Sequence, residues 1–364
     1  MFLTAQGTGG YANVYENVFV NVIIMTRNQK TTISDVAERA GVSAGTVSRV
    51  LNRQEGAPET RRRVVDAARK LGYRPDMYAS GMRSNRKRCM GILVESSLGH
   101  HDPWLEKVTL AMADLLSEAG YRCMLEFWSK DEENLPRVLD SVDGCMLLGD
   151  FPEEFFSRVE REVGLPLVNH DEKMPYENGA SLRTDWQAGV DQVVQYLLAF
   201  GHTKVGLVVA GTRYPSLRAR YEGFLEAMPH FGHEIDDTLV AATETFEDRG
   251  YETARRLTGE LLDRRPDLTG IVYGSDLMAF GGMRTLKERG LEVPADVSVV
   301  GFDDTDAART MVPPLTSVGV DYKELAMRQL HCLETLIGER TVMPDLTVRP
   351  RLVRRESVTR CEEC

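Results

Sequence analysis

The chain has 364 residues, 42% of them hydrophobic, and a formal net charge of −11 at pH 7. That length exceeds the size of one ordinary domain, and the apolar content is enough to build sizeable cores. No apolar run reaches the ~18 residues that span a membrane, and the apolar patch from Val18 to Met25 lacks the basic start and cleavage site of a signal peptide, so a membrane protein and an exported protein are not indicated. Its six cysteines do not form a disulfide framework, and we expect a cytoplasmic location.

The charge is divided unevenly along the chain. Residues 30–88 hold 14 Lys or Arg and 6 Asp or Glu, a net of +8, whereas residues 89–364 hold 29 and 48, a net of −19. A basic segment attracts phosphates, and an acidic body is repelled by them. We therefore expect nucleic acid to bind residues 30–88 only.

Residues 1–29 differ in composition from the rest of the chain. They are rich in Gly, Asn, Tyr and Val, and only Glu16 and Arg27 are charged. We expect this segment to be either an over-extended translation start or a disordered arm. A functional arm that reaches into DNA would need more than one basic residue.

The stretch from Thr32 to Asn52, TISDVAERAGVSAGTVSRVLN, predicts two short helices joined by a tight turn. Thr32 and Ser43 are candidate N-caps, and Gly41 permits the positive-φ turn that ends the first helix. Apolar residues recur at helical spacing in both halves, and a charged surface helix is the alternative. Two capped helices around one glycine turn favour a helix-turn-helix, the motif that places a helix in the DNA major groove.

A third helix is predicted from Pro58 to Leu71, with Gly72 ending it. Its expected inner stripe is Val64, Val65, Ala68 and Leu71. A short segment, 76–84, leads into a basic run that ends at Arg88.

After Cys89 the pattern changes to apolar strands that alternate with amphipathic helices. The segments CMGILVE, YRCMLEFW, GCMLLG, LPLVN, KVGLVVA, TLVAAT, TGIVYG and VSVVGF are expected strands. The helices between them are expected near 104–119, 132–140, 152–162, 217–230, 248–264 and 277–289. This alternation is typical of parallel sheets covered on both faces. Eight such units predict two doubly wound lobes, with a ligand cleft at the carboxyl ends of their strands.

The chain resembles the lactose-repressor/galactose-repressor family of bacterial transcription regulators. The resemblance rests on TISDVAERAGVSAGTVSRVLN, PETRRRVVDAARKLGYRPD, GHTKVGLVVAG, SDLMAFGGMRTLKERGLEVPADVSVVGFDDT and PPLTSV. It covers about nine tenths of the length. It implies an α/β protein, in which an all-α helix-turn-helix head is joined to a two-lobed core like that of periplasmic binding proteins.

The resemblance also implies a domain organisation. We expect a DNA-binding head at 30–75, a hinge helix and linker at 76–88, a two-lobed effector-binding and dimerisation domain at 89–357, and a tail at 358–364. Lobe 1 is expected at 89–200 and 317–342, and lobe 2 at 201–316 and 343–357, so that the chain crosses near 201, 317 and 342. A flexible linker is the alternative to the hinge helix.

The resemblance assigns DNA contacts to the head and hinge. The family positions that reach base edges correspond to Ala44, Gly45 and Arg49. Met82 stands where the family inserts a leucine into the minor groove, and it follows Gly81, which is a poor helix residue. The full expected DNA-binding set is Thr32, Ser43, Ala44, Gly45, Thr46, Ser48, Arg49, Asn52, Met82 and Arg83.

For the ligand, Arg220 and Asp303 match the arginine and aspartate that bind sugar hydroxyls in the family. The expected ligand-binding set is Trp104, Asp185, Arg220, Ser275, Phe302 and Asp303. Ser275 and Trp186 each replace an asparagine that is usual in the family, which leaves the identity of the sugar open. Trp104 is either an aromatic lid or a core residue.

Other classes of protein remain as alternatives. The sequence lacks a Walker loop and an HExxH pair, so an enzyme is not expected, and neither is a metal or cofactor. A solute-binding module would not carry a basic helix-turn-helix. We expect a cytoplasmic homodimeric repressor that binds a pseudo-palindromic double-stranded operator and responds to a small effector, a sugar or else another metabolite such as a nucleobase.

Overall fold

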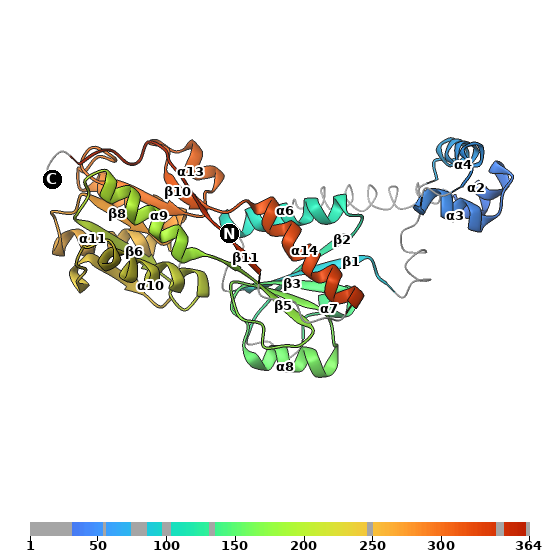
Figure 1. Cartoon of the computed structure of the whole chain (residues 1–364), viewed down its shortest axis with the longest axis horizontal. Coiled ribbons are helices and arrows are strands. Elements are labelled where there is room, and N and C mark those ends of the chain that lie inside the picture. The colour runs from blue at the N-terminus through green and yellow to red at the C-terminus, as the bar shows by residue number, and fades with distance from the viewer. Residues whose placement is uncertain are drawn as a thin grey trace, which may run out of the picture. The chain divides into compact units, whose positions relative to one another are not determined.

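The computed structural model describes residues 31–53, 56–73, 86–96, 103–130, 135–245, 250–339 and 346–361 (Figure 1). The chain divides into two compact units, Met1–Ser84 and Asn85–Cys364. The N-terminal segment 1–29 lies outside the described residues. So does most of the expected hinge, including Met82 and Arg83.

The described part of the smaller unit contains helices α2 (Ile33–Ala40), α3 (Ala44–Arg53) and α4 (Pro58–Lys70). The Thr32 side chain accepts a hydrogen bond from the backbone N–H of Asp35, and the Asp35 carboxylate accepts one from the backbone N–H of Thr32 at 2.7 Å. This capping box starts α2, and Gly41 ends it with a φ of 64°. The predicted helix-turn-helix is confirmed.

The core of this head is small and aliphatic. Val36, Val47 and Val64, one from each helix, are buried at its centre. The prediction that Val65 faces inward is wrong, since Val65 is 47% exposed and Ala67 is buried in its place. Successive helical residues are about 100° apart, so the burial of Val64 turns its neighbour outward.

Two sheets form the framework of the larger unit. Among the described residues each sheet has six strands, in the orders β11-β5-β4-β3-β1-β2 and β12-β10-β9-β8-β6-β7. All neighbours are parallel except the antiparallel pair of β10 and β12. The two predicted doubly wound lobes are confirmed.

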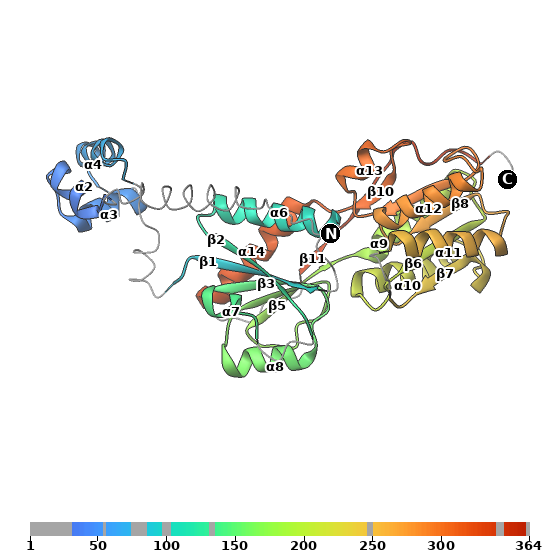
Figure 2. The ribbon, with the colours of Figure 1, turned by 180° about the vertical axis from the view of Figure 1, so that it is seen from behind.

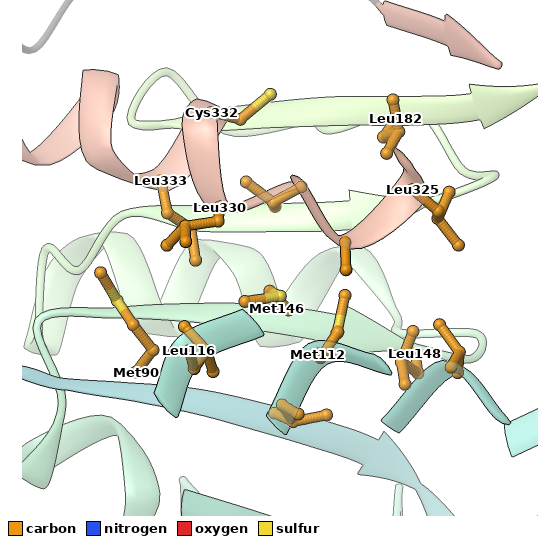
Figure 3. Close-up of a cluster of buried hydrophobic side chains, with 14 of the residues drawn as sticks. Met90, Met112, Leu116, Met146, Leu148, Leu182, Leu325, Leu330, Cys332 and Leu333 are labelled. Carbon is orange, nitrogen blue, oxygen red and sulfur yellow. The ribbon is translucent and has the colours of Figure 1, made fainter. Parts of the chain in front are cut away.

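The first lobe is built on β1 (Cys89–Glu95), β2 (Arg122–Trp128), β3 (Gly144–Leu148), β4 (Leu167–His170), β5 (Gly179–Thr184) and β11 (Leu346–Val348). Helices α6 (Pro103–Glu118) and α14 (Tyr322–Glu339) cover one face of this sheet. Met112, Met146 and Leu333 are among the side chains buried there (Figure 3). Helices α7 (Val138–Ser141) and α8 (Glu153–Glu162) cover the other face (Figure 1).

The second lobe is built on β6 (Val205–Ala210), β7 (Val240–Thr243), β8 (Gly270–Tyr273), β9 (Ser298–Phe302), β10 (Thr316–Gly319) and β12 (Arg351–Val353). Helices α9 (Trp186–Ala199) and α10 (Pro215–His230) pack on one face, and α11 (Tyr251–Arg264) and α12 (Asp276–Glu288) pack on the other. Figure 2 shows α11 and α12 side by side on that outer face. The short helix α13 (Asp306–Thr310) follows β9.

The chain crosses between the lobes at places that differ from the prediction. The crossings lie between β5 and α9 near 185, between β10 and α14 near 320, and between β11 and β12 near 350. The boundary expected near 201 is wrong because the apolar side chains of α9, from Trp186 to Leu197, lie in the core of the second lobe. The boundary expected near 342 is wrong because β11 pairs with β5 of the first lobe.

The segment 358–364 was expected to be a tail, but residues 358–361, the part that the structure describes, pack on the second lobe. Val358 is 8% exposed and belongs to the core of the second lobe. The backbone N–H of Thr359 donates to Ser298 Oγ at 3.1 Å, and that of Cys361 donates to the carbonyl of Phe200 at 2.8 Å. Residues 358–361 therefore complete the second lobe, because Val358 removes apolar surface from water. No helix within the described part of the chain is long and apolar enough to cross a membrane.

Candidate functional site

The outward face of α3 carries few side chains that could reach a base. Gly45 and Arg49 are exposed, whereas Ala44 is half-buried against the core of the head. Ser43 Oγ accepts from the backbone N–H of Thr46 at 3.2 Å and bonds the Thr46 hydroxyl at 2.9 Å. This pair caps α3. Between residues 44 and 51, Arg49 is then the long polar side chain that projects outward.

The remaining residues expected to contact DNA differ in exposure and in their local contacts. Thr32 is engaged in the cap of α2, and Ser48 is half-buried. Asn52 lies within α3, but its side chain is outside the described residues.

Lys87, in the basic run before β1, is bound to the first lobe. Its ammonium donates to the carbonyls of Asp140 at 2.8 Å and Val142 at 3.1 Å. Its backbone N–H donates to Asp143 Oδ1 at 2.7 Å. Lys87 therefore anchors the start of the larger unit.

A cleft opens between the two lobes where strands β3, β4, β6, β8 and β9 end. The space between its walls is about 710 Å³, which includes the open mouth. Its walls are formed by Trp104, Gly149, His170 and Asp171 of the first lobe and by Trp186, Tyr214, Pro215, Ser216, Leu217, Arg220, Ser275, Met278 and Asp303 of the second. Ligands bind at this end of open parallel sheets because the strand ends leave a crevice there.

Arg220 is held at the second-lobe wall of the cleft by four neighbours. Its Nη2 lies 2.9 Å from Asp303 Oδ1, and its Nη1 donates to the carbonyl of Gly274 at 2.6 Å. The guanidinium carbon lies 3.8 Å from the centre of the Trp186 ring and 4.9 Å from that of Phe302. Planar stacking and directed N–H groups fix the guanidinium in one plane.

Asp303 adopts an unusual backbone conformation. Its φ is 100° and that of Asp304 is 47°, a region that costs non-glycine residues about 1–3 kcal/mol each. A Cβ on Gly319 would lie 2.3 Å from the Cβ of Asp304, so glycine is required at that facing position. This turn points the Asp303 carboxylate at Arg220. Burial raises the pKa of Asp303, although Arg220 opposes that shift.

Asp171 holds the first-lobe wall together and reaches the second lobe. Its Oδ2 accepts the indole N–H of Trp186 at 2.9 Å and lies 3.3 Å from His170 Nε2. Its Oδ1 accepts the backbone N–H of Thr184 at 2.6 Å. Burial favours a higher pKa for Asp171, but His170 and these donors outweigh burial and hold that pKa below its ordinary value.

A second buried carboxylate supports the site from behind. Asp276 Oδ2 accepts the backbone N–H of Thr305 at 2.7 Å and its hydroxyl at 2.9 Å, while Oδ1 accepts the Ser317 hydroxyl at 2.6 Å. Ser317 Oγ in turn accepts the backbone N–H of Asp304 at 3.0 Å. Burial, together with the charge of Asp303, raises the pKa of Asp276 to about 7.

Comparison with known proteins shows which family the two units resemble. Residues 32–76 match the model of bacterial regulatory proteins of the lacI family, and residues 194–358 match that of the periplasmic binding protein-like domain. The HTH-type transcriptional regulator CelR of Thermobifida fusca is 31% identical over 343 residues, which cover 92% of this chain and 100% of that one. The HTH-type transcriptional repressor PurR of Pasteurella multocida (strain Pm70) is 28% identical over 90% of this chain and 98% of that one.

The chain belongs to the lacI family of bacterial regulatory proteins. It is a DNA-binding transcriptional regulator. Among solved structures, the complex of transcriptional regulator CelR with cellobiose is 29% identical, covers 90% of this chain and 99% of that one, and has a TM-score of 0.66. The lac repressor dimer bound to operator and the anti-inducer ONPF shares the fold, with 23% identity, coverage of 91% and 100%, and a TM-score of 0.69.

Within this family member the cleft brings together four of the six residues expected at the ligand, namely Trp104, Arg220, Ser275 and Asp303. The other two do not line the cleft. Asp185 is the N-cap of α9, where its Oδ1 accepts the backbone N–H of Ala188 at 3.1 Å. Phe302 is fully buried behind Arg220 rather than in the wall.

Sequence reasoning missed Asp171, His170 and Tyr214 in the wall. Asp171 follows β4 in the segment LVNHD, just as Asp303 follows β9 in VVGFD. A polar residue directly after a buried strand was therefore the available indication. Trp186 was noticed only as a departure from the family pattern.

Proposed function

We propose that this chain is a repressor whose operator affinity is set by a small sugar held in the cleft, and that it acts as a homodimer. The observation that carries the proposal is the buried pair of Arg220 and Asp303 in the cleft wall. A carboxylate can accept two hydroxyl hydrogen bonds, and a guanidinium donates within a fixed plane. Together they suit neighbouring hydroxyls on a ring. The solved CelR relative with cellobiose supports the choice of a sugar.

Contacts between the lobes provide the route from ligand to DNA. Lys107 of the first lobe donates to the carbonyl of Asp304 and lies 3.8 Å from Asp306 Oδ1. The Tyr322 hydroxyl donates to the carbonyl of Asp303 at 2.7 Å. A ligand that moves Asp303 therefore changes how the lobes meet, and the first lobe carries the chain that leads to the head. Coupling of this kind amounts to about 1–3 kcal/mol.

The homodimer is supported by apolar surface on the first lobe. Leu125 of β2 is 51% exposed, Leu110 of the adjacent α6 is 58% exposed, and β2 is the edge strand of its sheet. An unpaired edge beside exposed leucines favours association with a second copy. Two copies would present two heads to a pseudo-palindromic operator, as expected for helix-turn-helix proteins. The lac repressor solved on its operator is a dimer.

The test is a titration of operator binding against sugars. An operator is first selected from a random duplex library with the purified full-length chain, and its affinity is measured by fluorescence anisotropy. Neutral mono- and disaccharides are then added, and one of them should change operator affinity by about 5–150-fold. If every sugar leaves operator affinity unchanged and a free nucleobase alters it, the effector is a nucleobase and the sugar proposal is wrong.

A further inference from the structure

The charges that line the cleft are unequal. Its walls contain two aspartates, Asp171 and Asp303, but a single guanidinium, that of Arg220. The charge of Arg220 is compensated by Asp303 at 2.9 Å, in a pair whose side chains are 4% and 9% exposed. Asp171 has no Lys or Arg within hydrogen-bond distance in the described part of the chain; its contacts are with Trp186, Thr184 and His170.

Asp171 is instead held by neutral donors. The indole N–H of Trp186 and the backbone N–H of Thr184 bond its two oxygens. The imidazole of His170 needs only one proton, on Nε2, to bond it as well. This wall therefore keeps a buried negative charge stable through hydrogen bonds and the neighbouring imidazole, rather than through a Lys or Arg partner.

The inner wall also holds buried polar atoms that have no partner within the described residues. His170 Nδ1 is buried with no partner within the described residues, and with the proton on Nε2 it is an acceptor. On Arg220, Nη1 is bound to Gly274 and Nη2 to Asp303, while Nε is buried with no partner within the described residues. The wall thus suits hydroxyl groups, which both donate and accept hydrogen bonds.

Basic side chains near the mouth do not line the cleft and have partners of their own. Lys107 is bound to Asp304 and Asp306 of the second lobe. Arg218 lies 4.0 Å from Glu172 Oε1, and Arg213 donates to the Tyr214 hydroxyl at 2.8 Å. A phosphate or carboxylate in the cleft would have to displace one of these pairs.

Resting on the proposed function, we infer that the cleft selects an uncharged polyhydroxyl ligand and rejects its phosphorylated and carboxylate forms. Asp171, which has no Lys or Arg partner, repels an anion that enters, and its own oxygens cannot bond phosphate oxygens. Rejection by a fixed like charge is an established way to obtain specificity. The hydroxyl hydrogens of a neutral sugar satisfy the same acceptors.

The test uses calorimetry on the full-length chain with matched pairs of probes. Each pair is a neutral mono- or disaccharide and its 6-phosphate or its uronic acid. The uncharged member of the best-binding pair should bind at least about tenfold more tightly than its anionic partner, and the ratio should shrink at high salt. Binding of the anionic member with equal or higher affinity overturns the inference while leaving the proposed sugar response intact. If no member of any pair binds, the proposed function fails, and the inference fails with it.

Two charge-neutralising variants test whether Asp171 causes the preference for the neutral ligand over the anionic one. Asp171→Asn should weaken binding of the neutral sugar yet reduce the preference over the anion by about tenfold or more. The matched control is Glu160→Gln on α8, an exposed residue on the outer side of the first lobe, which makes the same charge change and should leave the ratio as it is. An unchanged ratio in Asp171→Asn, or an equal loss in Glu160→Gln, contradicts a role for Asp171 in rejecting anions.

Discussion

Trp186 donates its indole N–H to Asp171 Oδ2 at 2.9 Å, and this hydrogen bond joins the two lobes inside the cleft. The face of the same indole is stacked on Arg220, with 3.8 Å between the guanidinium carbon and the ring centre. One tryptophan therefore links the aspartate of one lobe to the ligand-binding arginine proposed in the other. Its position as the first residue of α9, directly after the crossing near 185, makes this link possible.

Trp186→Phe should weaken ligand binding about tenfold. The variant keeps a ring to stack on Arg220 but leaves Asp171 without a charge-assisted hydrogen bond, a loss of about 1.5–3 kcal/mol. Calorimetry with the sugar found to release or strengthen operator binding measures the effect. Trp128→Phe is the control, because Trp128 lies in the core on the far face of the first-lobe sheet and its Nε1 has no partner among the described residues. Equal losses in both variants would contradict the assigned link.

Arg220→Met should abolish ligand binding and lower the free energy of unfolding by about 3–5 kcal/mol, since Asp303 becomes a buried charge without a partner. Adding Asp303→Asn to that variant should recover most of the free energy of unfolding without restoring ligand binding. Arg220→Lys should not restore binding, because an ammonium cannot bond Asp303 and Gly274 while stacked on Trp186. Chemical denaturation and calorimetry distinguish the two effects. A double variant as unstable as the single one would show that the charge pair is not the cause.

Stability of the larger unit should fall as pH rises from about 4 to about 7. Burial and the charge of Asp303 raise the pKa of Asp276 from 3.8 to about 7. Within that interval the folded protein holds a proton that the unfolded chain has released, so the free energy of unfolding decreases with rising pH. Asp276→Asn cannot titrate and should flatten this slope in urea denaturation at several pH values, leaving the part that the raised pKa of Asp303 contributes. Asp267→Asn is the control, because Arg265 holds the pKa of Asp267 at about 2 and its contribution is lost only below the interval.

Arg49→Ala should cost about 1–3 kcal/mol of operator affinity and relax the preference at one base pair in each half-site, as expected for an arginine that bonds guanine O6 and N7. Arg86→Ala, in the exposed basic run, should weaken all sequences alike and reduce the salt dependence. Binding to a library of single-base operator variants measures both. If Arg49→Ala lowers affinity uniformly and keeps the base preference, Arg49 is a phosphate contact.

Leu125→Glu should convert the dimer to a monomer, since a charge on the exposed edge strand β2 opposes burial of that surface. Light scattering at micromolar concentration gives the mass. Val312→Glu is the control, because Val312 is 92% exposed on the second lobe, outside the proposed surface. A mass near two chains for Leu125→Glu would place the interface elsewhere.

Local patterns in the sequence were enough to determine the head. Thr32, Gly41 and Ser43 cap and terminate helices through contacts within three residues or through their own backbone preference, so their roles can be predicted without knowing the rest of the fold. The strands and helices of the two lobes were likewise predicted from their apolar runs. The error at Val65 arose where two adjacent valines both fitted an inner stripe, and tertiary contacts decided that Val64 is buried.

Tertiary structure alone decided which lobe each segment joins and which side chains meet in the cleft. The apolar face of helix α9 could pack on either lobe as far as the sequence shows. Its contact with the core of the second lobe places the crossing near 185, whereas the sequence predicted 201. Asp171 and Trp186 are close in sequence, but their bond depends on the two segments entering different lobes on either side of that crossing. Asp276, Ser317 and Asp304 come from three separate segments that only the sheet order brings together. Capping and periodicity act within a few residues, whereas the cleft is made of hydrogen bonds and charges that exist only once distant strand ends lie side by side.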